Sequence, residues 1–421
     1  MPQTRDKLNY KQRERIFDKV YKLVIKHYFD PKFNGTDWPT IAQSCRQEIV
    51  GVDEPEAFET AMHGLVRRLG TSHTGFFHQS VRRVPARLAV GASFSRNATD
   101  GGAHWVASDV HGGGPAELAG LKPGDVLVSV NDRPLLPPEQ PMFAMGAEFA
   151  LAIRRADEQH TLRVVVPLPR SRKQPYCEPR AVESSQLDQN TGYLKVSILP
   201  GLLGLDVARE IDAAVAELSS CDRLVLDLRG HLGGGLGVLR LMSYLTPENI
   251  PIGFTLSRKR AELGYEKEKL PRLDRLPTHL PNPFGVASLA FRFGGRDSSV
   301  VLVSEGLGPQ RWHGRIAILV NEHTVSAGEM VAAFAAENKL AVIVGTETAG
   351  RLIPGSGTKV GEGYMLIMPR AQYITWQGRR FEGKGIEPEL AISLDQTEAG
   401  TDGALATARR ALDDCGAVAI A

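Results

Sequence analysis

The feature that most constrains the fold is an alternation of strand-like and helix-like runs in the second half of the chain. Short apolar runs alternate there with longer runs in which apolar residues recur at helical spacing. The strand-like runs are 193–199, 224–228, 315–320, 341–344 and 364–368, and the helix-like runs are 205–218 and 327–338. This order predicts a mixed sheet flanked by helices, so we expect an α/β domain over residues 176–421.

The first part of the chain predicts a separate helical unit. Apolar residues recur at helical spacing over residues 10–29, Asp37 is placed to cap a second helix, and a third helix is expected over residues 56–69. The chain has 421 residues, and at about 150 residues per domain it has room for roughly three domains. We therefore expect residues 1–80 to form a small helical unit.

Between these two regions, residues 81–169 predict short strands joined by tight turns. Pro115 fits the first position of a one-turn helix, and Gly120 fits the left-handed residue that ends such a helix. The run 112–131 that contains them resembles the PDZ domains attached to bacterial-type proteases. The resemblance implies that an extended peptide adds to a sheet edge and rests its carboxylate on backbone N–H groups, the alternative being a PDZ-shaped spacer that binds no peptide. The residues it implies for this carboxylate loop are Leu88, Ala89, Val90 and Gly91.

Composition, charge and hydropathy exclude several classes of protein. The hydrophobic fraction of 42% and the charged fraction of 23% are ordinary for globular proteins, and 50 Lys and Arg against 48 Asp and Glu predict no nucleic-acid partner. The longest apolar run, residues 330–336, is far shorter than the ~20 residues of a membrane-spanning helix. Residues 1–15 are charged and lack the apolar segment of a secretory signal, so we expect a cytoplasmic protein.

The cysteines and histidines predict neither a metal nor a cofactor. The cysteines lie far apart, without the close pairs of metal knuckles or redox motifs, and we expect free thiols. They are Cys45, Cys177, Cys221 and Cys415. His78 could pair with His73 at a metal, but no third ligand is evident.

Residues 257–314 interrupt the α/β pattern with a stretch rich in Pro, Gly and charged residues. Loops of this length in compact domains are usually functional covers or disordered. We therefore expect a long excursion that is a candidate lid.

Ser326 stands where a strand-like run turns into a helix-like run. At such a turn a hydroxyl is exposed, and the backbone N–H groups that follow point outward as anion donors. Ser326 and Glu329 also fit a capping box, so an ordinary helix cap is the alternative for this serine.

A glycine-rich loop, residues 227–235, follows another strand-like run. Successive glycines let backbone N–H groups converge on a developing oxyanion. The loop could equally hold a phosphate or merely turn the chain, but it lacks the Lys-Ser/Thr ending of a P-loop and the spacing of a dinucleotide motif. We therefore do not expect a nucleotide.

Three motifs occur in order after the PDZ-like module: 227–234, 324–329 and 382–388. Together they resemble the C-terminal-processing and tricorn-core family of serine peptidases, and the likeness runs from the loop 72–76 to Pro388. The resemblance implies a multidomain α/β protein whose core is an α/β spiral of the crotonase and Clp-protease type. For the reaction, it implies Ser326 as nucleophile, with an oxyanion hole made by the N–H of Ala327 and one from Gly233 or Gly234.

The family resembled has two ways of activating its serine. In the tail-specific branch the base is a lysine about 25 residues after the serine, but this chain has Arg351 there, and arginine keeps its proton. In the tricorn branch the base is a histidine that precedes the PDZ domain. The resemblance therefore implies that His73 takes the proton of Ser326, and that Glu382, directly or through Ser72, orients the imidazole.

Two residues compete locally for these roles. His323 lies three residues before the serine, and Glu387 is the alternative to Glu382. In addition, His231 stands where the family resembled often has Asn.

These observations predict a serine endopeptidase that cleaves extended or C-terminal polypeptide segments through an acyl-enzyme. His231 and Arg351 leave open a catalytically inactive pseudo-peptidase that acts as a PDZ peptide-binding adaptor. A non-proteolytic hydrolase or acyl-transferring enzyme on the same scaffold is a third interpretation. Polypeptides are the expected partners, and both homo-oligomer formation and control of the site by the PDZ domain stay open.

Overall fold

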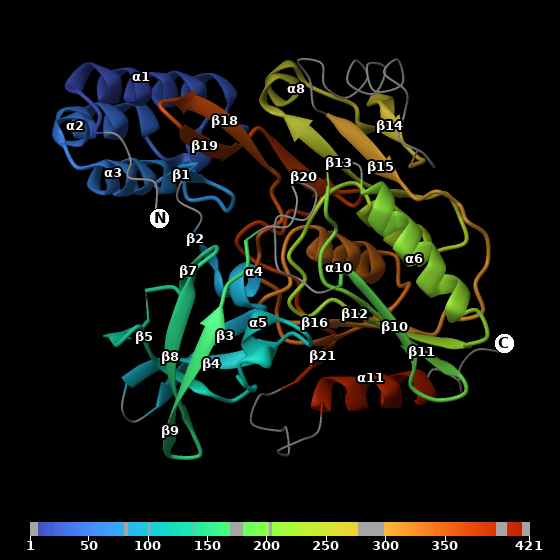
Figure 1. The fold of residues 1–421 in the computed structure, drawn as a ribbon. Coiled ribbons are helices and arrows are strands. Elements are labelled where there is room, and N and C mark those ends of the chain that lie inside the picture. The colour runs from blue at the N-terminus through green and yellow to red at the C-terminus, as the bar shows by residue number, and fades with distance from the viewer. Residues whose placement is uncertain are drawn as a thin grey trace.

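The computed structural model contains a helical part, a β-rich part and an α/β part (Figure 1). The helical part lies at the upper left of Figure 1, the β-rich part below it, and the α/β part on the right. The structure describes residues 7–79, 83–99, 102–137, 139–168, 180–201, 204–276, 299–392 and 402–414. Cys177 and Cys415 lie outside these ranges, whereas Cys45 and Cys221 are free thiols.

The three predicted N-terminal helices are present. They are α1 (Tyr10–His27), α2 (Trp38–Gly51) and α3 (Pro55–Arg67), with a 3-10 turn, η1 (Phe33–Gly35), between the first two. Asp37 caps α2 as expected, since the Thr40 N–H donates to its Oδ1 at 3.3 Å. Phe17, Trp38 and Phe58 are fully buried among these helices.

Strands from the C-terminal quarter of the chain complete the N-terminal unit. Strand β1 (Gly75–His78) pairs antiparallel with β19 (Tyr364–Pro369), which pairs in turn with β18 (Gly355–Gly361). The ring of Phe76 stacks on that of Tyr364, with the centroids 5.0 Å apart. The helical unit therefore includes residues far beyond 80, and this pairing fixes the position of the loop that carries His73.

The β-rich part is a six-stranded sheet and a separate two-stranded sheet, β2-β7, with two short helices. Its strands and helices are β2 (Arg83–Pro85), α4 (Ala86–Val90), β3 (Ala92–Thr99), β4 (Gly102–Val110), α5 (Pro115–Leu118), β5 (Val126–Val130), β6 (Arg133–Pro134), β7 (Met142–Ala144), β8 (Glu148–Arg155) and β9 (Glu158–Val165). The sheet order is β3-β4-β5-β8-β9, and β6 adds to β5. Pro115 begins α5 as predicted, and Gly120 has the predicted positive φ, 90°.

The larger α/β sheet brings two loops to one edge. Its order is β10-β11-β12-β16-β17-β21, in which all neighbours after β10 are parallel. The strands are β10 (Val182–Gln186), β11 (Thr191–Val196), β12 (Arg223–Asp227), β16 (Ile316–Val320), β17 (Val342–Gly345) and β21 (Leu390–Ala391). Because β12 and β16 are parallel neighbours, the loops that follow them meet at the carboxyl edge of the sheet. These are the two loops that carry the glycine run and Ser326.

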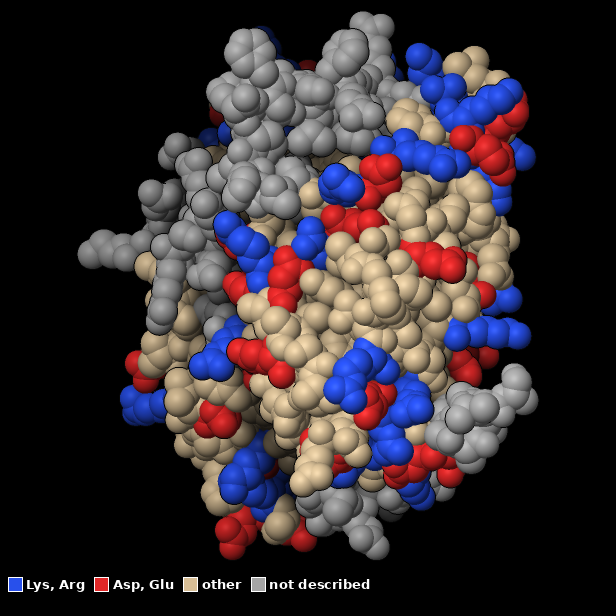
Figure 2. Space-filling view, turned by 90° about the vertical axis from the view of Figure 1, so that its right-hand side faces the viewer, with Lys and Arg blue, Asp and Glu red and all other residues tan. Residues whose placement is uncertain are grey.

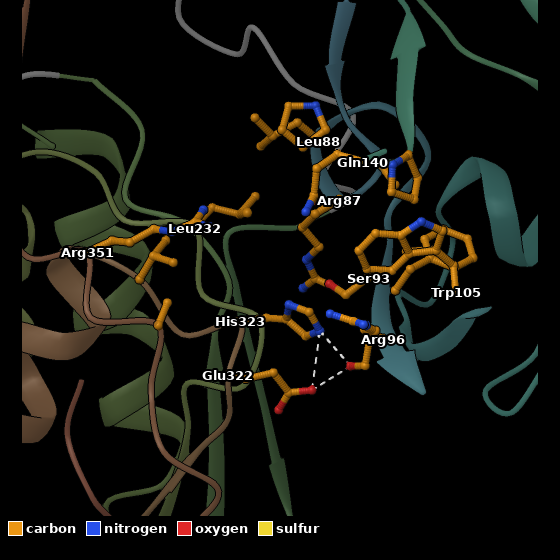
Figure 3. A pocket seen from close by; sticks show the side chains of 18 of the residues that line it. Arg87, Leu88, Ser93, Arg96, Trp105, Gln140, Leu232, Glu322, His323 and Arg351 are labelled. Carbon is orange, nitrogen blue, oxygen red and sulfur yellow. Dashed lines mark hydrogen bonds and ion pairs between the residues drawn. The ribbon is translucent and has the colours of Figure 1, made fainter. Parts of the chain in front are cut away.

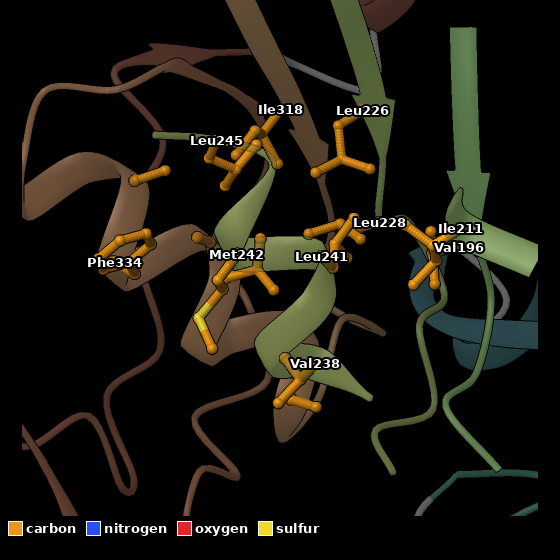
Figure 4. Close-up of a cluster of buried hydrophobic side chains, with 14 of the residues drawn as sticks. Val196, Ile211, Leu226, Leu228, Val238, Leu241, Met242, Leu245, Ile318 and Phe334 are labelled. Carbon is orange, nitrogen blue, oxygen red and sulfur yellow. The ribbon is translucent and has the colours of Figure 1, made fainter. Parts of the chain in front are cut away.

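Helices cover both faces of this sheet. Helices α6 (Leu205–Glu217), α7 (Val238–Ser243) and α10 (Ala327–Glu337) bury their apolar side chains in one cluster with residues of the strands. Helix α11 (Gly403–Asp414) packs Ala408 and Leu412 against the opposite face. Figure 4 shows part of the first cluster, where Phe334 of α10 and Met242 of α7 lie near Ile318 of β16.

The expected excursion, 257–314, contributes a second sheet where it is described. Strands β14 (Arg272–Leu273) and β15 (Val300–Val303) join β13 (Pro251–Ser257) and β20 (Ala371–Thr375) in the order β14-β15-β13-β20. Between β13 and β14 lie α8 (Arg258–Leu263) and a 3-10 turn, η2 (Lys267–Lys269). Strands β14 and β15 are therefore part of a sheet, whereas α8 and η2 bury no residue. Residues 277–298 of the candidate lid lie outside the described residues, so the lid stays a prediction.

Acidic and basic side chains are intermixed on the face that Figure 2 shows, which is the right-hand side of Figure 1. Among the described residues, no helix is long and apolar enough to cross a bilayer.

The core packing predicts the stability of one variant. Phe334 is 1% exposed in the main cluster, so Phe334→Ala leaves a cavity and lowers the free energy of unfolding of the α/β part by about 3–5 kcal/mol. Calorimetry or urea unfolding measures this loss. The control is Leu263→Ala, whose side chain is 73% exposed and which should change the value by at most about 0.5 kcal/mol.

Candidate active site

Ser326 occupies a strained turn between β16 and α10. Its φ of 55° and ψ of −114° lie outside the extended region that an ordinary N-cap residue adopts, and such a conformation costs about 1–3 kcal/mol. The Ser326 N–H donates to Glu329 Oε2 at 3.0 Å and to the Arg351 carbonyl at 3.2 Å. These two acceptors hold the serine in its strained geometry.

The glycine loop after β12 lies directly against Ser326. A Cβ added at Gly233 would lie 2.7 Å from the Ser326 Cβ and 3.1 Å from its Oγ, so only glycine fits there. Gly234 has a φ of 146°, and a Cβ there would lie 2.0 Å from the Leu199 carbonyl oxygen. The structure thus brings Gly233 and Gly234 together with Ser326 and Ala327, the first residue of α10.

The two loops are joined by hydrogen bonds. The Gly230 N–H donates to Asn321 Oδ1 at 2.9 Å, and the Thr324 hydroxyl donates to the Leu228 carbonyl at 2.8 Å. The Gly233 N–H donates to His231 Nδ1 at 2.9 Å, and burial lowers the pKa of His231 to about 4. His231 is therefore a neutral, fully buried support of the loop, a role that the sequence interpretation missed.

Ser72, His73 and Glu382 form a hydrogen-bonded chain. Ser72 Oγ lies 2.9 Å from His73 Nδ1 and 3.0 Å from Glu382 Oε2, and the Ser72 N–H donates to Glu382 Oε1 at 2.6 Å. His73 has a positive φ of 54°. A Cβ added at Gly355 would lie 2.8 Å from its Cβ, so β18 approaches the histidine closely.

Glu329 connects the serine to the next segment of the chain. Its carboxylate is fully buried and accepts hydrogen bonds from four donors. The donors are the N–H groups of Ser326, Gly350 and Arg351 and the hydroxyl of Thr348, at 2.7–3.0 Å. Burial raises the pKa of Glu329, and these hydrogen bonds oppose the rise. Sequence reasoning identified this residue only as half of a capping box.

Glu382 holds the continuation of the same segment. Its Oε2 accepts the N–H groups of Leu352 and Ile353 at 3.0 and 3.1 Å. Four successive backbone N–H groups, 350–353, therefore donate to two carboxylates, one beside the serine and the other beside the histidine. This segment sets the position of Ser326 relative to His73.

The alternative residues lie in other surroundings. His323 Nε2 lies 2.9 Å from the Ser108 hydroxyl and 3.2 Å from that of Ser95, both in the β-rich part. His78 on β1 contacts the Glu362 carbonyl at 3.0 Å, and Glu387 is exposed. No cluster of three potential metal ligands occurs among the described residues.

A cavity of about 590 Å³ lies between the β-rich part and the Ser326 loop. Figure 3 shows Leu88, Arg96 and Trp105 on one side and Leu232 and Arg351 on the other. Of the four residues expected to hold a peptide carboxylate, Leu88 lines the cavity, Ala89 and Val90 are fully buried, and Gly91 has a φ of 71°. They form the end of α4 and its left-handed cap, and their binding of a peptide carboxylate stays a prediction.

A serine at a strained strand-to-helix turn, faced by a glycine loop, is the arrangement of serine hydrolases. Comparisons with known proteins make the class specific. Residues 190–392 match Peptidase family S41, 106–165 match the PDZ domain, and 9–65 match the Tricorn protease C1 domain. The chain is therefore a serine-type peptidase that contains a domain of peptidase family S41, and its β-rich part is a PDZ domain.

Curated relatives and solved structures agree with this assignment. The chain is 23% identical to carboxyl-terminal-processing peptidase 3 (chloroplastic) of Arabidopsis thaliana, over 92% of this chain and 70% of that protein. The probable CtpA-like serine protease of Staphylococcus haemolyticus is 23% identical to this chain. The matched region covers 67% of this chain and 49% of that relative. The solved photosystem II D1 C-terminal processing protease has the same fold, with a TM-score of 0.58 and 17% identity over 90% of this chain and 93% of that one. Since the relatives include a chloroplastic protein, the cytoplasmic location stays a prediction.

The contacts of Glu329 predict a large effect of a small change. In Glu329→Gln an amide NH₂ replaces one oxygen, so two buried donors lose their acceptor, and the folded state loses about 2–5 kcal/mol. Thermal unfolding measures the loss against Glu347→Gln, a nearby exposed carboxylate. Equal melting temperatures for the two variants would show that the four hydrogen bonds to Glu329 do not stabilise the folded state.

Proposed function

We propose that the chain is a serine endopeptidase that cleaves extended or C-terminal polypeptide segments through an acyl-enzyme on Ser326. The observation that carries the proposal is the hydrogen-bonded chain from Glu382 through Ser72 to His73. The names of the curated relatives support a polypeptide substrate.

The protons available to Glu382, Ser72 and His73 determine the tautomer of the His73 imidazole. The Ser72 hydroxyl has one proton, and the ionised Glu382 can only accept, so Ser72 donates to Glu382 and accepts from His73 Nδ1–H. A neutral imidazole that is protonated at Nδ1 has an unprotonated Nε2. That is the form in which His73 can take a proton.

In the proposed reaction, His73 Nε2 takes the Ser326 proton as the Oγ attacks the scissile carbonyl. Glu382, through Ser72, stabilises the imidazolium that forms. The N–H of Ala327 binds the oxyanion together with an N–H of the glycine loop, and since Gly233 donates to His231, Gly234 is the second donor. The imidazolium then protonates the leaving amine, and water, with His73 again as base, hydrolyses the acyl-enzyme.

The nucleophile and base are tested together. Ser326→Ala and His73→Ala should each lower cleavage of an unfolded protein by about 10⁵-fold or more, and Ser326→Ala should abolish labelling by a fluorophosphonate probe. His160→Ala, a histidine on β9 of the PDZ domain, is the matched control. Undiminished cleavage by either active-site variant contradicts the assignment. A wild-type protein that takes up no probe and cleaves nothing would instead be the peptide-binding adaptor.

The acid group is tested by two carboxylates in one segment. Glu382→Gln should lower kcat by about 10²–10⁴-fold, whereas the exposed Glu387→Gln should not. Loss of hydration lowers the pKa of His73 below 6.5, Glu382 raises it and Arg351 lowers it. Because only the neutral imidazole is a base, the acid limb of the wild-type pH–rate profile should lie below pH 6.5, and in Glu382→Gln it should move lower still. If the acid limb does not move in Glu382→Gln, Glu382 does not stabilise the His73 imidazolium.

A further inference from the structure

The cavity between the PDZ domain and the Ser326 loop has mainly apolar walls. Leu88, Phe94 and Trp105 line it from the PDZ domain, and Ile198 and Leu232 line it from the α/β part. It therefore suits an extended peptide with apolar side chains, and the charged groups at its rim decide which peptides are favoured.

Arg351 reaches this cavity from a backbone position fixed beside the nucleophile. Its carbonyl accepts the Ser326 N–H at 3.2 Å, and its own N–H donates to Glu329 Oε2 at 2.8 Å. Its side chain is exposed and lines the cavity together with Leu232 (Figure 3). Within the described part of the chain, no carboxylate forms an ion pair with the Arg351 guanidinium, in contrast to Arg87, which pairs with Asp109 at 2.6 Å.

The acidic residue that lines the cavity does not neutralise Arg351. Glu322 accepts the Ser95 hydroxyl on Oε1 at 2.6 Å and the Thr346 hydroxyl on Oε2 at 2.9 Å. Arg96 and Arg351 line the same cavity with this one carboxylate, so its lining carries an excess of positive charge even without Arg87, which Asp109 neutralises. A guanidinium binds a carboxylate through two parallel hydrogen bonds, and it binds more strongly where apolar walls exclude water.

We propose that Arg351 forms a carboxylate-binding subsite next to the nucleophile, so that substrates with a carboxylate close to the scissile bond are preferred. The carboxylate is either an Asp or Glu side chain or the α-carboxylate of a chain end. The inference rests on the proposed peptidase function and adds a substrate class to it. Arg351 is then a specificity residue, because arginine cannot serve as the base.

The experiment begins with a cleavage site mapped by mass spectrometry in an unfolded protein. Peptides around this site are made in matched pairs: Asp against Asn at the two positions on each side of the bond, and a free acid against an amide at an end close to the bond. The Asp pairs test a side-chain carboxylate, and the amide pair tests a chain end. The kcat/KM ratio within each pair is measured for wild type, Arg351→Gln and Arg351→Lys, and for Arg15→Gln, an exposed arginine on α1, as control.

Wild type should prefer the carboxylate member of at least one pair by about 10- to 100-fold. Arg351→Gln should reduce this ratio to near one, Arg351→Lys should retain part of it, and Arg15→Gln should retain all of it. Since Arg351 lowers the pKa of His73, Arg351→Gln should also move the acid limb to higher pH, equally for both members of a pair. Because this pH shift is the same for both members of a pair, it does not change the kcat/KM ratio, which reports selectivity alone. Ratios in Arg351→Gln equal to those of wild type, or wild-type ratios near one in every pair, overturn the proposal.

A failure of the peptidase proposal has a different signature. If wild type cleaves nothing, no cleavage site can be mapped, so binding of fluorescently labelled apolar peptides, made in the same Asp/Asn and free-acid/amide pairs, is followed by anisotropy. A carboxylate preference that Arg351→Gln abolishes then supports the subsite without catalysis. Equal binding of both members of each pair overturns it.

Discussion

The candidate active site depends on one arrangement, the four-residue segment 350–353 held between the buried carboxylate of Glu329 and the half-buried carboxylate of Glu382. Glu329 takes the N–H groups of residues 350 and 351 together with that of Ser326, and Glu382 takes those of residues 352 and 353 together with that of Ser72. Each carboxylate thus connects this segment to one part of the proposed catalytic group, Ser326 or the loop of Ser72 and His73. The strained backbone conformations of Ser326 and His73, both with positive φ, cost free energy. These charge-assisted hydrogen bonds compensate for that cost.

The PDZ domain contacts the same loops through polar side chains. Ser95 and Ser108 approach His323 and Glu322 on the nucleophile loop, and His111 Nε2 lies 3.1 Å from the Ser197 hydroxyl next to β11. A Cβ at Gly230 would lie 2.9 Å from Asp109 Oδ2, so the glycine loop also touches the PDZ domain. Junctions of this polar kind are weaker than an apolar core and compatible with relative movement of domains.

Local sequence patterns predicted most of the elements and the two loops of the site. The reason is that each loop directly follows its strand: Ser326 comes between β16 and α10, and the glycines follow β12. Because β12 and β16 are parallel neighbours, their pairing alone brings Ser326 close to Gly233. Residues 72 and 382 were joined by resemblance, and no local pattern could have placed them 3.0 Å apart. That contact depends on the pairing of β1 with β19. The alternation of side chains along a strand does not reveal which distant strand it pairs with. The short helix at residues 86–90 and its glycine cap were not predicted, because so few residues give no clear period.

The β1–β19 pairing also orders events during synthesis. His73 is made long before the strand β19 that pairs with β1 and ends at Pro369, and before Glu382, which accepts the Ser72 hydroxyl beside it. A nascent chain that has already exposed its PDZ domain and Ser326 still lacks both. Domains generally fold in order as they emerge, so the loop that carries His73 gains these contacts only after residue 382 has been made. Under the proposed mechanism, translation would thus separate the appearance of Ser326 from the completion of the hydrogen-bonded group of His73, Ser72 and Glu382.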